Sequence, residues 1–180
     1  GGNPGGVTTI QRIDYGNDTA TAVAKGPLTV GRIEHGATGN KDFGYYAGGS
    51  PTTVDRLDYS NDTATTVAKG PLTSARQYLA ATGDASFGYI VGGFTSSSYL
   101  ISTVDRLDYS NDTATAVAKG PLSTGRAVSA GASSRANALP TIGPKTVDKG
   151  ADGYKTTSFG PAYGYLAAGS APSVSTMTQI

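Results

Sequence analysis

The fold follows from one stretch of sequence that occurs twice almost unchanged. It reads Thr53-Val-Asp-Arg-Leu-Asp-Tyr-Ser-Asn-Asp-Thr-Ala-Thr-Thr-Val-Ala-Lys-Gly-Pro-Leu72 and recurs over residues 103–122, with Ala116 in place of Thr66 as the single difference. A looser copy covers residues 9–28. Self-similarity at a fixed period is typical of repeat architectures, in which each unit buries its faces against its neighbours.

The spacing of the copies fits a small β-sheet unit. Asp14 and Asp58 lie 44 residues apart, whereas Asp58 and Asp108 lie 50 apart because extra residues are inserted around positions 94–101. Propeller blades repeat every 40 to 50 residues or so. Four strands are predicted in each unit because short runs rich in Val, Thr and Tyr alternate with turn residues: Thr53–Tyr59, Thr63–Ala68, Ala75–Ala81 and Phe87–Val91.

The sequence therefore predicts an all-β protein of propeller-like blades. Residues 1–132 hold three clear four-stranded repeats, at about 7–49, 50–93 and 94–132. Residues 133–162 are an irregular insertion, and residues 163–180 resemble a partial fourth repeat. Closed propellers have at least about four blades, so closure is expected either through the chain's own termini or through other copies of the chain.

Composition excludes several kinds of protein. Fourteen basic and 13 acidic side chains give a net charge of +1, which offers no reason to expect nucleic acid or an anionic membrane as partner. The absence of cysteine excludes disulfides and thiolate chemistry, and no apolar run is long enough for membrane insertion. The first residue is Gly1 and no signal peptide is visible, so we expect a processed chain or a piece of a longer one.

Catalytic chemistry is not expected. The one histidine, His35, has no recurring partner, and metal sites and catalytic triads need histidine placed with partners. Carboxylates recur in pairs, Asp58 with Asp62 and Asp108 with Asp112, which favours turn scaffolding over an active site. Calcium at these turns stays an alternative because they offer several oxygens. We predict no catalytic residue, no metal and no cofactor.

Several repeated positions are expected to be structural. An arginine follows each Pro-Leu pair, and its fork of donors suits either a ring of guanidiniums or bonds to carbonyls and to an Asp of a neighbouring blade. Glycine doublets allow close backbone approach at strand ends. These positions are Arg32, Arg76, Arg126, Gly48, Gly49, Gly92, Gly93, Asp58 and Asp108.

Recognition is expected where the repeats differ. The insertion at 94–100 carries aromatic side chains among hydroxyls, a combination that makes adaptable binding surfaces, and the second insertion is similar. Oligomer contacts or ordinary loops are the alternative reading. The candidate binding residues are Phe94, Ser96, Ser98, Tyr99, Tyr154 and Phe159.

The unit resembles the kelch repeat. Val54-Asp-Arg-Leu-Asp58, Pro71-Leu72, Arg76 and Gly88-Tyr-Ile-Val-Gly-Gly93 match its motifs over about residues 5–130, although no Trp occurs where that family carries one. The resemblance implies propeller blades and a protein-interaction or adhesion module, cellular or secreted.

The string Val-Asp-Arg-Leu-Asp-Tyr-Ser-Asn-Asp-Thr-Ala-Thr, followed by Lys-Gly-Pro-Leu and Phe-Gly-Tyr, is also similar to repeats in virion structural proteins and tail fibres of marine cyanobacterial phages. This closer resemblance implies a virion location on the phage tail or surface, and a non-enzymatic role in fibre structure or host attachment. Its implied partners are the chain itself, as a homo-oligomer with a trimer favoured, other virion proteins, and a host surface glycan or protein. A polysaccharide-degrading enzyme on a propeller is the third hypothesis.

Overall fold

The computed structural model describes residues 5–97, 100–133, 164–167 and 178–179. Within them the secondary structure is β-strands and two short 3-10 helices, with no α-helix, so the all-β prediction is confirmed. The strands are β1 (Ile10–Arg12), β2 (Val23–Lys25), β3 (His35–Gly39), β4 (Phe43–Gly48), β5 (Val54–Asp58), β6 (Val67–Lys69), β7 (Ala80–Gly83), β8 (Phe87–Val91), β9 (Val104–Asp108), β10 (Val117–Lys119), β11 (Ala130–Ser133), β12 (Gly164–Ala167) and β13 (Thr178–Gln179), and the 3-10 helices are Tyr59–Asn61 and Tyr109–Asn111.

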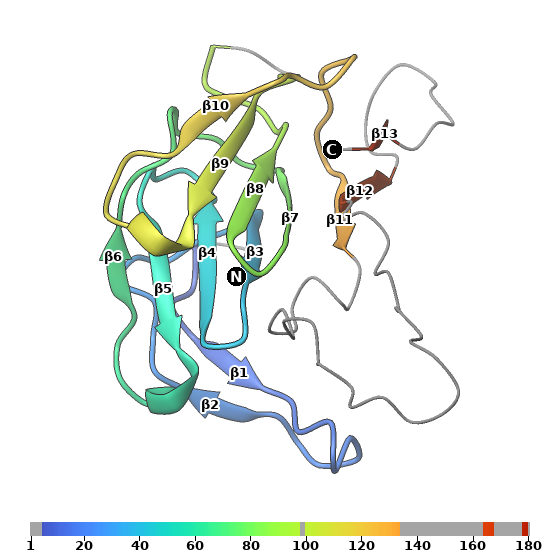
Figure 1. Ribbon diagram of the computed structural model, residues 1–180. Helices are drawn as coiled ribbons and strands as arrows, with labels where there is room; N and C mark the ends of the chain where they lie inside the picture. The colour runs from blue at the N-terminus through green and yellow to red at the C-terminus, as the bar shows by residue number, and fades with distance from the viewer. Residues whose placement is uncertain (1–4, 98–99, 134–163, 168–177, 180) are drawn as a thin grey trace, which may run out of the picture.

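The strands form antiparallel sheets that follow one another along the chain (Figure 1). Two sheets have four strands, in the orders β3-β4-β5-β6 and β7-β8-β9-β10. The hairpin β1-β2 precedes them, and the three-stranded sheet β11-β12-β13 follows. Strand β7 packs against β3 on one side and β11 on the other, so the first strands of successive sheets lie side by side.

Each four-stranded sheet draws its strands from two sequence repeats. The first two strands of a sheet end one repeat, and its last two strands begin the next. The repeat at 50–93 therefore supplies the last two strands of one sheet, β5 and β6, and the first two strands of the next, β7 and β8. A single repeat cannot form a sheet by itself, which couples neighbouring units through backbone hydrogen bonds as well as through packing.

Two predicted strands have wrong bounds. The second begins at Val67 instead of Thr63, because a 3-10 turn and the bond from the Ala64 N–H to the Asn61 carbonyl take up its start. The third begins at Ala80 instead of Ala75, because the backbone before it pairs with other segments, as in the Gln77–Phe94 bridge. The first strand differs by one residue at each end, and Phe87–Val91 is as predicted.

Strands β12 and β13 of the predicted partial fourth repeat pair antiparallel, as β8 and β9 do. Tyr165 lies opposite Gln179, and Leu166 lies opposite Thr178. Residues 134–162 of the predicted insertion lie outside the described residues, and its first residue, Ser133, ends β11. The described strands do not form a closed ring of sheets.

An arginine and an aspartate pair in the interior of each four-stranded sheet. Arg32 contacts Asp55 at 3.1 Å and Arg76 contacts Asp105 at 3.0 Å, and all four side chains have no exposed surface. Arg32 also donates to the Gly48 carbonyl, 2.8 Å away. Buried charges are costly unless they are paired and hydrogen-bonded. Each pair therefore fixes the position of the arginine-bearing loop that precedes the first strand of its sheet.

Apolar side chains fill the space between the two four-stranded sheets. The largest cluster comprises Tyr45, Ala47, Val54, Leu72, Leu79, Ile90, Leu107 and Ala116. Tyr45 of one sheet stacks on Tyr109 of the next, with ring centroids 4.7 Å apart, and the Tyr109 hydroxyl lies 2.9 Å from that of Thr38. This packing replaces what tryptophan supplies in many repeat cores.

A turn of each four-stranded sheet reaches back to the preceding strands through an aspartate. Asp62 binds Arg12 at 2.7 Å and Lys25 at 3.0 Å. Asp112 repeats this arrangement with Arg56 and Lys69 of the sheet before it. We call these two clusters the first and second inter-sheet joints.

The second joint is more deeply buried than the first. Its Asp112 also accepts a hydrogen bond from the Tyr45 hydroxyl, 3.0 Å away. In the first joint, the hydrogen bond from Lys25 lowers the pKa of Asp62, and the charge of Arg12 acts in the same direction. In both joints, one carboxylate is bound by two basic side chains.

Backbone contacts accompany both joints. The Gly26 N–H donates to the Asp62 carbonyl and the Gly70 N–H to the Asp112 carbonyl, both at 2.8 Å. The approach is close: a Cβ on Gly70 would lie 1.9 Å from the Ala114 carbonyl oxygen, and one on Gly26 would lie 1.7 Å from that of Ala64. Glycine is therefore required at both joints.

Replacing Asp105 by Asn should destabilise the protein by about 3 kcal/mol, because it leaves the Arg76 cation buried without a counter-charge. The matched control is Asp42→Asn, whose ion pair with Lys41 is exposed and should contribute less than about 1 kcal/mol. Urea denaturation of the two variants measures the difference. Equal losses would contradict the importance of the buried pair.

Gly70→Ala should lower the thermal midpoint markedly, because the added methyl meets backbone at the second joint. The same change at Gly120, the corresponding position of the last repeat, should leave the midpoint nearly unchanged, since no described atom lies within 4 Å of its Cβ. Circular dichroism melts of dilute protein test both. A similar midpoint for the two variants would refute the close approach at Gly70.

Candidate functional site

Three residues with left-handed backbone mark the start of the first strands of successive sheets. Glu34, Tyr78 and Val128 have φ values of 53°, 56° and 54°. The Tyr78 N–H donates to the Glu34 carbonyl at 2.9 Å, and the Val128 N–H donates to the Tyr78 carbonyl at 2.8 Å. These bonds join the three positions into a continuous series across the sheets, which we call the inner line.

The inner line combines a constant backbone with changing side chains. An acidic, an aromatic and a β-branched residue occupy the same strained conformation, which costs roughly 1–2 kcal/mol for a residue other than glycine. Val128 is 55% exposed, and Glu34 and Tyr78 are half-buried. Strain of this kind persists where the surroundings impose it, and it is concentrated at binding and catalytic sites.

His35 adjoins the inner line. Its ring is half-buried beside Tyr46, with centroids 6.0 Å apart, and occupies the position that core residue Leu79 holds in the next sheet. Burial lowers its pKa to about 4, and the charge of Arg32 acts in the same direction. In the described residues, neither His35 Nδ1 nor Glu34 Oε2 has a hydrogen-bond partner, although both atoms are buried.

The first predicted binding segment lies next to the inner line. Phe94 packs on Tyr78 with ring centroids 4.6 Å apart, and its backbone exchanges two hydrogen bonds with Gln77. Ser96 is exposed on the loop that follows. The structure thus brings Phe94 to the inner line, whereas Ser98, Tyr99, Tyr154 and Phe159 lie outside the described residues.

The predicted structural positions have internal partners. Arg76 donates to the Ile90 carbonyl at 3.0 Å, so Arg32 and Arg76 each bond a carbonyl and an Asp; each Asp belongs to the next sequence repeat, which contributes to the same sheet. Arg126 is also buried. Every glycine of the two doublets has positive φ, with values of 80° and 78° at Gly48 and Gly49 and 63° and 97° at Gly92 and Gly93.

The paired carboxylates serve two different purposes. Asp58 and Asp108 cap their turns by accepting from Ser60 and Ser110, and the bonds from the serine hydroxyls lower the pKa of both carboxyls. Asp62 and its counterpart instead bind the preceding sheet. Within the described ranges, no three His, Asp or Glu side chains gather as a metal site would require.

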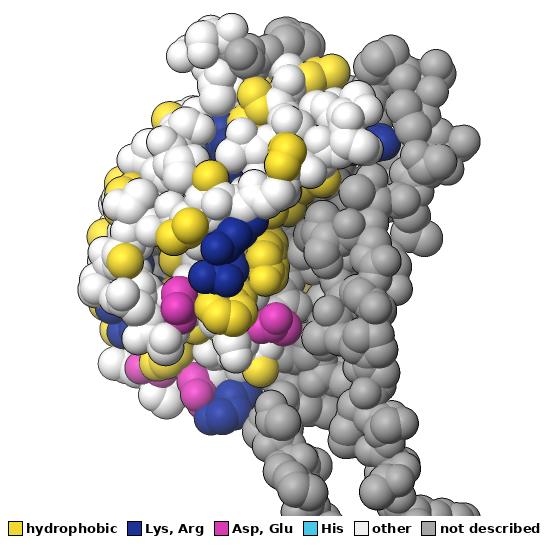
Figure 2. Space-filling model, turned by 45° about the horizontal axis from the view of Figure 1, so that its top comes forward, with side chains coloured by type: hydrophobic (Ala, Val, Ile, Leu, Met, Phe, Trp, Pro, Cys, Tyr) yellow, Lys and Arg dark blue, Asp and Glu magenta, His cyan; other side chains and the backbone are white. Residues whose placement is uncertain are grey.

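The charges on the described surface are mixed in sign. Figure 2 shows basic side chains set among hydrophobic ones, with acidic side chains close by. Arg56 and Arg106 lie over the rings of Phe43 and Phe87, each 4.3 Å from the centroid. Such an alternation suits contacts with a polar, uncharged or weakly charged surface better than contacts with a polyanion.

Two sets of residues were missed by sequence reasoning. The inner line was overlooked because a left-handed conformation is unusual for Glu, Tyr or Val and leaves no sign in a single sequence. The joints were overlooked because Asp62 and Asp112 were read as part of a turn. Their recurrence together with a Lys-Gly-Pro segment in every repeat was the available signal.

Between pH 6.5 and 4 the protein should lose stability through His35. The folded state disfavours the charged ring, so protonation is coupled to unfolding, and the loss starts at the unfolded pKa and is complete near the folded one. His35→Gln should remove about 1 kcal/mol of this loss, a value reduced because the ring is partly solvated. Urea titrations at pH 7 and pH 4.5 measure it; identical pH dependence in both proteins would refute the effect.

Comparison with known proteins does not assign the chain to a family. No model of a known protein family matches the chain, and no curated protein matches it. No helix among the described residues has the length and apolar character needed to cross a membrane.

Proposed function

We propose that this chain is a non-enzymatic virion structural protein, a phage tail-fibre or host-receptor-binding module built from kelch-like propeller blades. The observation that carries the proposal is the inner line, where side chains of different chemistry stand on one repeated backbone. A recognition surface needs this division, because a rigid scaffold fixes positions while variable residues determine the ligand.

The contacts around the inner line support recognition over catalysis. Tyr78 and Phe94 form an aromatic pair, and Ser96 and exposed Val128 lie on the adjoining loop and strand start. Aromatic and hydroxyl side chains together are typical of adaptable binding surfaces for proteins and glycans. The repeated aspartates Asp58, Asp105 and Asp112 are engaged in a cap, a buried pair and a joint, which favours a structural use for them.

Repetition supports a role in multivalent attachment. Weak contacts at several copies of one module give strong overall binding without any single tight site. The proposed location is the phage tail or virion surface, with other virion proteins and a host surface glycan or protein as partners.

Val128→Lys should weaken host binding at least about tenfold, which corresponds to 1.4 kcal/mol, because it adds a charge to the inner line. Purified chain is used to compete with phage adsorption to host cells. Val67→Lys is the matched control, since Val67 is 52% exposed but lies on an outer strand. If both variants compete equally well with phage adsorption, the inner line is not part of the binding surface.

Mass spectrometry and gold-labelled antibodies on purified particles test the location. Peptides of the chain and label at the tail are expected. Absence from particles, together with capture of a peptide partner by the inner line, would favour a cellular or secreted adhesion module instead.

A further inference from the structure

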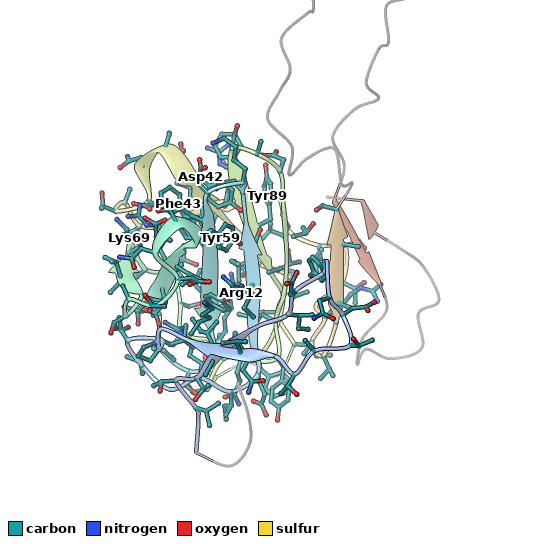
Figure 3. All side chains as sticks on the ribbon, turned by 90° about the horizontal axis from the view of Figure 1, so that it is seen from below. Arg12, Asp42, Phe43, Tyr59, Lys69 and Tyr89 are labelled. Carbon is teal, nitrogen blue, oxygen red and sulfur yellow. The ribbon has the colours of Figure 1, made fainter. Side chains whose placement is uncertain are left out.

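The last four-stranded sheet carries the receiving half of a third inter-sheet joint. Arg106 and Lys119 occupy the same register as Arg12 with Lys25 and as Arg56 with Lys69. Tyr89 stands where Tyr45 stands in the second joint. Figure 3 labels one residue of each joint: Arg12 of the first, Lys69 of the second and Tyr89 of the third.

This third half-joint is uncovered in the described residues. Gly26 and Gly70 are buried by the turns that dock on them, whereas Gly120 is exposed and has no described atom within 4 Å of its Cβ position. Lys119 is exposed although Lys25 and Lys69 are half-buried. The buried Nε of Arg106 has no hydrogen-bond partner in the described part of the chain.

The complementary half lies at the opposite end of the array. The turn that follows β1 shares two hydrogen bonds with the docking turns: the Gly16 N–H donates to Asp14 at 2.8 Å, and the Ala20 N–H donates to the Asn17 carbonyl at 3.2 Å. The same bonds recur around Ser60 and Ala64. Asp18 therefore corresponds to Asp62, and it is exposed.

We propose that the β1-β2 hairpin of a second copy of this chain docks on the last four-stranded sheet, with its Asp18 carboxylate bound by Arg106 and Lys119. The Tyr89 hydroxyl and the Gly120 N–H then donate to Asp18 as Tyr45 and Gly70 donate to Asp112. The Pro121 carbonyl accepts from Ala22, as the Pro27 and Pro71 carbonyls accept from Thr66 and Ala116. The contact is specified by opposite charges and by the arrangement found in the two internal joints.

The docked hairpin also completes the third sheet. In both internal joints, the turn comes from the last two strands of the following sheet. Here the following sheet is β11-β12-β13, in which the two residues of β13 hold the third-strand position. The hairpin takes the place of β13 beside β12, so that β1 and β2 supply the third and fourth strands.

A buried arginine supports this completion. Arg126 is 3% exposed, and its Nη1 has no hydrogen-bond partner among the described residues. Its counterpart Arg76 pairs with Asp105 of the third strand. In β1 the corresponding residue is Gln11, whose side-chain oxygen can accept a hydrogen bond from a guanidinium.

The contact is reciprocal between two copies. Each copy presents one uncovered half-joint and one exposed docking turn. Two head-to-tail contacts therefore close a pair. The pairing differs from the trimer that the fibre resemblance implies, and it does not depend on the proposed virion role.

Sedimentation of the 180-residue chain tests the contact. The wild-type chain should have twice the monomer mass of 18.1 kDa. Gly120→Ala should yield monomers that melt like dilute wild-type protein, because its methyl meets only the incoming turn. Asp18→Lys should raise the dissociation constant at least tenfold, whereas the control Asp42→Asn, an exposed carboxylate on another turn, should not.

A mixing experiment gives an independent test of the geometry. Asp18→Lys and Lys119→Asp chains should each associate poorly, but an equimolar mixture should form pairs, because one contact regains opposite charges and the other is wild type. A monomeric wild-type chain, or a dimer unaffected by Gly120→Ala and Asp18→Lys, would overturn the proposal. If the wild-type chain forms species larger than a dimer and both variants lose them, the contact is supported and the closed pair is refuted.

Discussion

The structure depends on an arginine that is buried once in every repeat. The side chain of Arg76 binds Asp105 and the carbonyls of its own sheet, while its backbone carbonyl accepts the Gly49 N–H of the preceding sheet. Arg126 accepts from Gly93 in the same way, at 2.7 Å. One residue thus fixes both the interior of a sheet and its distance from the neighbour. The constant distance of these arginines from the preceding Pro-Leu pair agrees with that double task.

Small residues set the thickness of the stack. Glycine at Gly36, Gly48 and Gly92 lets side chains or backbone of the next sheet approach to distances that a Cβ would forbid. Tyrosine then fills the remaining space, as in the Tyr45–Tyr109 stack. Thr38 and Thr82 add side-chain hydrogen bonds to carbonyls of the following sheet, at 2.9 and 3.0 Å. A core of this kind needs no tryptophan.

Much of the architecture could be predicted from the sequence because it is repeated. Recurring Val, Thr and Tyr runs indicated the strands, and the fourth strand of the unit, Phe87–Val91, was located correctly. The pairing across repeats could not be seen, since every copy has the same strands and the sequence does not say which copies share a sheet. The segment before β6 looks like a strand because Thr and Ala alternate there, yet its Ala64 N–H bonds the Asn61 carbonyl of its own turn and its Thr66 N–H bonds the Pro27 carbonyl of the preceding repeat.

The sequence reasoning on the site located one part of it and missed another. Phe94 was singled out because the insertion interrupts the period, and it does adjoin the inner line. Glu34, Tyr78 and Val128 carry no common chemistry, so only backbone angles relate them. Likewise, Asp62 and Asp112 share a motif with the capping aspartates but act over a longer range, which only three-dimensional neighbours reveal.

The offset between repeats and sheets has a genetic consequence. Recombination between the two near-identical stretches would remove residues 54–103 and join β4 directly to β9. The product would still contain a complete sheet, β3-β4-β9-β10, because the crossover falls between strands that pair in the same way. Arrays of this type can therefore lengthen or shorten by whole modules during evolution without leaving a broken sheet behind.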